Sequence, residues 1–85
     1  MARYNLYPAN GPALLNVSVR GCSGLNPRAA ADVMRKAIVR YHRGRADLFL
    51  PQSRPGHIIA LPHMTAESDG PEVDVPLDGL RWEVA

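Results

Sequence analysis

The sequence predicts a single small α+β domain of two layers, in which one helix packs on an antiparallel sheet of four to five strands. Three observations lead to this prediction: one amphipathic helical segment, several short segments that alternate like strands, and a ββαβββ order without any βαβ unit. A chain of 85 residues supports one hydrophobic core, so we expect this domain to span residues 1–85. Eight prolines and seven glycines indicate that turns and loops take up much of the chain.

The first two strands are predicted to form a hairpin. Residues 3–7 and residues 13–20 both show the period of two that is typical of a half-buried strand. The segment between them contains two prolines, an asparagine and a glycine, which favour a turn. The side chains expected to face the core are Tyr4, Leu6, Leu15, Val17 and Val19.

The helix is predicted over residues 27–41. Asn26 is a typical N-cap, and Pro27 suits the first helical position because its missing N–H has no partner there. Gly44 suits the position that follows the helix C-terminus. Apolar residues recur with i, i+3, i+4 spacing and predict the side that faces the sheet. They are Ala30, Val33, Met34, Ala37, Ile38 and Tyr41.

The chain after the helix begins with a second predicted hairpin. Residues 46–50 and residues 57–61 are short apolar segments separated by six residues, a length that suits a hairpin loop. Residues 62–79 are rich in turn formers and acids. We therefore expect an irregular, acidic segment there, with at most a short edge strand at Val73 and Val75.

The last predicted strand covers residues 80–84. Leu80, Trp82 and Val84 alternate with charged residues, as expected when one side of a strand is buried. Because tryptophan buries a large apolar area, this pattern predicts that Trp82 packs in the core against the helix.

The net charge of +2 hides an uneven distribution of charge along the chain. Residues 1–58 carry nine arginines or lysines and two acids, whereas residues 59–85 carry one arginine and six acids. Two interpretations stay open. The acidic part folds beside the basic part and neutralises it, or the two parts form separate faces for two partners. Nine of the ten cations are arginines, whose planar guanidinium suits phosphate or carboxylate groups.

No catalytic or metal-binding motif is recognisable in the sequence. Cys22 and the three histidines (His42, His57 and His63) lack the spacing of zinc ligands. Cys22 could be combined with a histidine and Asp47 as a nucleophilic site, but no local motif surrounds it. We therefore expect a protein that is not an enzyme and that uses no cofactor or metal.

The sequence also lacks features of a membrane or exported protein. Its longest apolar run is four or five residues, against about 20 for a membrane-spanning helix, and its first residues contain no apolar export signal. The lone Cys22 cannot form an internal disulfide, which suits a reducing compartment. We expect a cytoplasmic protein with no membrane partner.

The outer face of the helix is the candidate functional site. Cations predominate on the side opposite the apolar stripe, and acids are nearly absent from it. Val39 lies in the middle of this side, where a purely solvated helix normally carries a polar residue. The residues expected to bind a partner are Arg28, Arg35, Lys36, Val39, Arg40, Arg43 and Arg45.

The kind of partner has competing interpretations. The face lacks the aromatic and amide side chains that read nucleic-acid sequence or stack on single strands. We therefore expect a protein or nucleoprotein partner, with non-specific nucleic-acid binding as the alternative. In size, single-core layout and lack of catalytic motifs the chain resembles small phage or mobile-element proteins that act by binding, among them anti-CRISPR inhibitors and capsid-decorating proteins. This resemblance concerns layout alone, and implies an inhibitor of a host defence complex or, alternatively, a phage structural protein.

Overall fold

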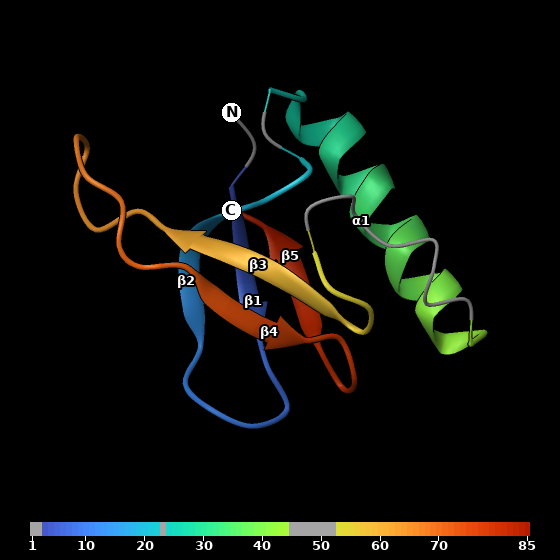
Figure 1. The fold of residues 1–85 in the computed structure, drawn as a ribbon. Coiled ribbons are helices and arrows are strands. Elements are labelled where there is room, and N and C mark those ends of the chain that lie inside the picture. The colour runs from blue at the N-terminus through green and yellow to red at the C-terminus, as the bar shows by residue number, and fades with distance from the viewer. Residues whose placement is uncertain (1–2, 23, 45–52) are drawn as a thin grey trace.

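The computed structural model describes residues 3–22, 24–44 and 53–85, and shows one helix on a five-stranded sheet (Figure 1). Its elements are β1 (Tyr4–Tyr7), β2 (Leu14–Val19), α1 (Pro27–His42), β3 (His57–Pro62), β4 (Val73–Pro76) and β5 (Arg81–Val84). The strand order is β4-β3-β2-β1-β5, and all neighbours are antiparallel. The predicted α+β class and ββαβββ order are confirmed.

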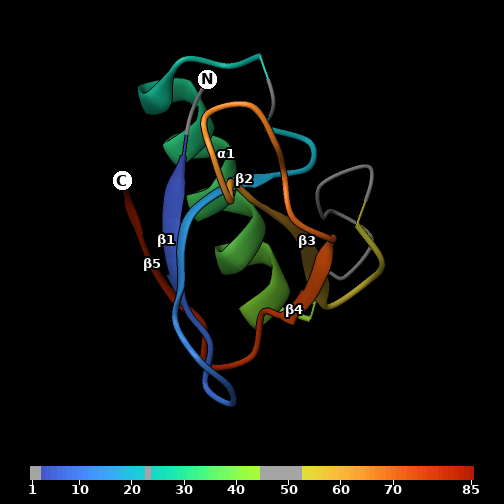
Figure 2. The ribbon, with the colours of Figure 1, turned by 90° about the vertical axis from the view of Figure 1, so that its left-hand side faces the viewer.

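The sheet is strongly curled, and α1 packs on its concave side (Figure 2). β1 and β5 form one arm of the curl, β3 and β4 form the other, and β2 joins them. The core fills the space between the two arms and the helix. Its buried residues are Tyr4, Leu6, Val17, Val19, Cys22, Ala30, Met34, Ala37, Ile58, Ala60, Val75, Leu77 and Leu80.

A β-bulge in β2 shifts the alternation of that strand by one residue. Two residues of β1 that lie two positions apart pair with Val17 and Leu14, which lie three positions apart. Asn16 absorbs the extra residue with φ +56°, in the left-handed region that asparagine tolerates. As a result Leu15 is 60% exposed, and Leu14 packs against the core instead. The prediction that Leu15 faces the core is therefore wrong.

The helix begins at the predicted residue and ends one residue later than predicted. The side chain of Asn26 accepts a hydrogen bond of 2.8 Å from the N–H of Ala29, as an N-cap does. Gly44 has φ +75°, and its N–H donates to the carbonyl of Tyr41 at 2.8 Å. The predicted apolar stripe faces the core, and Ala31 beside it is buried as well. Within the described ranges no helix combines the length and apolarity needed to cross a membrane.

The second half of the sheet has connections that the sequence did not indicate. The neighbours of β3 are β2 and β4, whereas the prediction paired residues 57–61 with residues 46–50, which lie outside the described residues. The strand at Val73 and Val75 is present as β4 and lies at the edge of the sheet. Loop and turn connections account for most of the remaining segment from 62 to 79, as expected for an irregular acidic stretch.

β5 forms the other edge of the sheet, where it pairs with β1. Trp82 is only half-buried: its ring meets the ring of Tyr4 edge-on at 5.7 Å, and the guanidinium of Arg35 lies 6.0 Å from its centre. Val84, on the same side of the strand, is 42% exposed. The prediction that this strand buries Trp82 and Val84 is therefore too strong, because an edge strand lacks a neighbour to cover its outer flank.

Candidate binding face of the helix

α1 exposes the side chains that the sequence assigned to a binding face. Arg28, Lys36, Arg40 and Arg43 are exposed, and Val39 among them exposes 43% of its surface. Arg35 is exposed as well. These side chains come from positions that fall on one side of a helix, opposite the buried stripe. Arg45 lies outside the described residues. We refer to the described residues Arg28, Arg35, Lys36, Val39, Arg40 and Arg43 as the basic face.

Two cations of the basic face have partners within the protein. The ammonium of Lys36 lies 3.1 Å from a carboxylate oxygen of Asp32, one turn earlier, and both side chains are exposed. Such a pair contributes only about 0.3–0.5 kcal/mol. Arg35 reaches over Trp82, in the geometry of an exposed cation–π contact. Arg35 therefore lies at the margin of the basic face and connects it to β5, which the sequence did not indicate.

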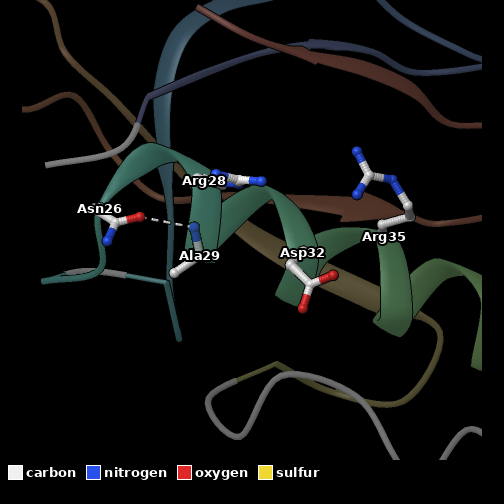
Figure 3. A pocket seen from close by; sticks show the side chains of 5 residues that line it. All are labelled: Asn26, Arg28, Ala29, Asp32 and Arg35. Carbon is white, nitrogen blue, oxygen red and sulfur yellow. Dashed lines mark hydrogen bonds between the residues drawn. The ribbon is translucent and has the colours of Figure 1, made fainter.

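The N-terminal half of the basic face is hollowed. A hollow of about 500 Å³ lies beside the first two turns of α1, and Figure 3 shows the side chains that line it. Arg28 and Arg35 extend to the same side, whereas the carboxylate of Asp32 is directed to the opposite side. Two guanidinium groups are thus directed to one side of this hollow, which favours an anionic group there.

A second hollow, of about 220 Å³, lies around Val39 in the C-terminal half of the basic face. Its other lining residues are Arg35, Lys36, Arg40 and Arg43. An apolar centre with a charged rim, rich in arginine, is the composition found at protein–protein interfaces. This half of the face therefore suits an acidic protein surface with an apolar projection better than it suits a bare phosphate chain.

The acidic segment pairs with cations that lie next to the ends of β2 and β3. Glu72 forms an ion pair with Arg20 at the end of β2. The two oxygens of Asp74 in β4 lie 2.7 Å from Nε of Arg54 and 3.0 Å from Nδ1 of His57. The acidic segment thus folds beside part of the basic chain, as one of the two interpretations expected. The partners lie at the sheet, and Arg28, Arg40 and Arg43 have no ionic partner in the part of the chain that the structure describes.

This pairing leaves the charge of the molecule separated in space. Residues 27–43 carry five cations and one acid, an excess of four positive charges. The other described residues carry four cations and six acids, an excess of two negative charges. The basic face therefore carries a local excess of positive charge, which attracts anions.

A Ser–His–Asp chain on the opposite side of the sheet was not evident from the sequence. Oγ of Ser18 lies 2.6 Å from Nε2 of His63, and Nδ1 of His63 lies 2.9 Å from Oδ1 of Asp69. These contacts have the connectivity of a nucleophile, its base and an orienting acid. Ser18 is only 4% exposed, however, so the hydroxyl is covered where a substrate would approach. These three side chains instead connect the loop after β3 to β2.

The strand register explains why this Ser–His–Asp arrangement could not be predicted from the sequence. Ser18 pairs with Leu61, and His63 follows two residues later, just beyond the end of β3. The three residues are far apart along the sequence and belong to no local motif. They meet because β2 pairs with β3 and because His63 forms a bridge with Asp69.

The residues that were considered as metal ligands are distributed over the fold. Cys22 is buried in the core, where burial raises the pKa of its thiol. His42 is exposed at the end of α1, and the other two histidines pair with Asp74 and Asp69. Across residues 3–22, 24–44 and 53–85, no group of three histidine, cysteine or acidic side chains is arranged to hold a metal ion.

No protein-family model, curated protein or solved structure matches this chain. Its function is therefore inferred from its own residues and their arrangement.

Proposed function

We propose that this protein is a small, non-enzymatic binding protein that docks on an acidic surface of a protein or nucleoprotein partner through the basic face of α1. The observation that carries the proposal is the unequal pairing of the arginines. Arg20 and Arg54 are neutralised by acids of the segment after β3. Arg40 and Arg43 have no such partner among the described residues, although the chain contains eight acids.

The apolar centre of the basic face favours a protein surface over nucleic acid as the partner. Val39 lies exposed between cations, and burying its side chain on docking removes apolar surface from water. A protein that follows a phosphate chain gains nothing from an apolar residue at that position. Non-specific binding of nucleic acid is the second candidate function, and the unpaired arginines are the observation that favours it.

The layout of the chain suggests a narrower form of the same proposal. A cytoplasmic protein encoded by a phage or mobile element, which inhibits a host defence complex as anti-CRISPR proteins do, would need a compact scaffold and one docking face. Complexes that handle nucleic acid carry phosphate groups and present acidic protein surfaces, both of which attract a basic helix. A capsid-decorating protein is the further alternative, since it too would act by docking alone.

The test compares two double variants that change the net charge equally. Arg40→Gln with Arg43→Gln removes two unpaired cations of the basic face, whereas Arg20→Gln with Arg54→Gln removes two cations that are already paired. Each tagged variant and the wild type are used to capture proteins from host lysate, with and without nuclease, followed by quantitative mass spectrometry. We expect the helix variant to lose the captured partner and the sheet variant to retain it.

Equal losses in the two variants would mean that net charge governs capture and would contradict a specific docking face. Val39→Asp then separates the two candidate functions. It should abolish docking on a protein, because a charge replaces a desolvated apolar centre. It should have a smaller effect on retention by double-stranded DNA, in which the arginines make the contacts with phosphate. Capture that disappears on nuclease treatment would favour nucleic acid.

A further inference from the structure

The outer edge of β5 offers backbone groups for hydrogen bonding. The N–H of Ala85 donates to the carbonyl of Arg3 at 2.9 Å, so residues 81, 83 and 85 direct their backbone groups toward β1. In an antiparallel ladder the alternate residues direct theirs away. Trp82 and Val84 therefore direct their N–H and C=O groups to the outer flank, where no described strand pairs with them (Figure 2).

The same two residues leave apolar surface uncovered at this edge. Trp82 is half-buried and Val84 is 42% exposed, both on the side of the sheet that carries α1. β4 at the opposite edge differs, because Pro76 provides no N–H, and a proline protects an edge from pairing. The edge of β5 thus combines unpaired backbone with apolar side chains.

The charges of β5 are complementary to those of a second copy of the same strand. Arg81 and Glu83 lie on the other side of the strand, one on each side of Trp82 along the chain. If two copies of β5 pair antiparallel with Trp82 opposite Trp82, each Arg81 lies opposite a Glu83 of the other copy. A shift that centres the pair on Glu83 would place two glutamates opposite each other. Opposite charges across strands stabilise a pair and like charges destabilise it, so the charges favour the first register over the second.

We propose that this protein forms a homodimer in which β5 pairs antiparallel with β5 of a second copy, in the register centred on Trp82. The two copies share one ten-stranded sheet, related by a two-fold axis perpendicular to it. Both tryptophans lie on the same side of this sheet and cover each other's exposed flank. Both helices lie on that side as well, so the dimer presents two basic faces in one direction.

The proposal is tested by the mass of the protein in solution. Light scattering coupled to size-exclusion chromatography should give twice the mass of one chain for the wild type at micromolar concentration. Arg81→Glu should give a monomer, because each new glutamate lies opposite a Glu83. Glu83→Arg should also give a monomer, by placing two arginines opposite each other. The double variant Arg81→Glu with Glu83→Arg restores both pairs and should recover the dimer.

Mixing provides a second readout that depends on the register. Equal amounts of the Arg81→Glu and Glu83→Arg variants should form a mixed dimer, detected by native mass spectrometry, because one copy then carries two acids and the other two arginines. A monomeric wild type, or single variants that remain dimeric, would overturn the proposal.

A measurement on the wild-type protein alone tests the dimer even if the variants fail to fold. Dilution should shift the emission of the single tryptophan to longer wavelength, because the half-buried Trp82 loses the cover of the second copy when the dimer dissociates. An emission that does not change over the range in which the mass halves would refute the register. The variants that test the dimer change only residues of β5, none of which belongs to the basic face, so the mass measurement does not depend on the partner that the basic face binds.

Discussion

Arg28 occupies a position at which binding and stability favour different residues. It lies in the first turn of α1, a turn that contains no acid, and the positive end of the helix dipole disfavours a cation there. Arg28→Glu should therefore raise the free energy of unfolding by about 0.3–1 kcal/mol, measured by urea denaturation. The same change should weaken capture of the partner, because it reverses a charge on the basic face.

Arg28→Gln serves as the control, since it removes the cation without adding an acid. We expect it to be intermediate in both measurements. A variant with glutamate at position 28 that is more stable and still binds fully would exclude the N-terminal hollow from the site. The docking contact would then be confined to the region around Val39.

The buried hydroxyl of Tyr4 leads us to expect that the protein loses stability in alkaline solution. Its hydroxyl is buried without an oxygen or nitrogen partner among the described residues, and burial, together with the nearby thiol of Cys22, raises its pKa. A tyrosine whose pKa is raised in the folded state stabilises the fold fully below its ordinary pKa of about 10, and this contribution disappears as the pH rises further.

Tyr4→Phe removes the ionisable group and keeps the ring. We expect the variant to be no less stable than the wild type near neutral pH, because no hydrogen bond to oxygen or nitrogen is lost. Between about pH 9 and pH 11 it should lose less stability than the wild type, as followed by urea denaturation at each pH. Parallel loss in both proteins would assign the alkaline effect to Tyr7 and Cys22, whose pKa values are also raised.

The elements of the fold differ in how far they follow from sequence. The limits of α1 were predictable because the N-cap at Asn26 and the glycine at position 44 act on the residues next to them. The neighbours of β3 were not, because strand pairing depends on residues far apart in the chain. The prediction for Leu15 was wrong because of the bulge in β2, since a strict period of two contains no signal for an extra residue.

The bulge itself yields a test at Asn16. Its φ of +56° is accessible to glycine without strain and unfavourable for a β-branched residue. Asn16→Gly should change the free energy of unfolding little, whereas Asn16→Val should lower it by about 1–3 kcal/mol. Leu15→Thr is the matched control, since that neighbour is exposed and should tolerate the change. Equal stability of the valine and glycine variants would place the strain elsewhere in the strand.

At the scale of the whole molecule, the sequence indicated the basic face but not that the acids of the chain neutralise other cations. Helical spacing alone placed the cations and Val39 on one side of α1. It gave no information on which acids neutralise which cations, because Glu72 meets Arg20 and Asp74 meets Arg54 only through the folding of the sheet. The contact of Arg35 with Trp82 was hidden for the same reason.

Because the unpaired cations of the basic face lie apart from the paired charges, salt should affect binding and stability differently. Raising the salt from about 0.05 M to about 0.5 M should weaken capture by the basic face, because the Debye length becomes shorter than the reach of its exposed charges. The midpoint of thermal unfolding should move little, since exposed ion pairs such as Arg20–Glu72 contribute at most about 1 kcal/mol each. Capture that is insensitive to salt would show that Val39 and its apolar surroundings dominate docking.

The pairing of β1 with β5 has a consequence for the newly made chain. Tyr4 lies opposite Val84, so β1 lacks one of its two neighbours until the ribosome has added position 84. α1 depends on contacts within a few residues and can form while synthesis continues, whereas closing so long a loop is slow. The arm made by β1 and β5 therefore completes only after that stretch has left the exit tunnel. During this interval Tyr4 lacks the ring of Trp82 that packs against it in the finished fold, and incompletely covered apolar surface is what chaperones bind.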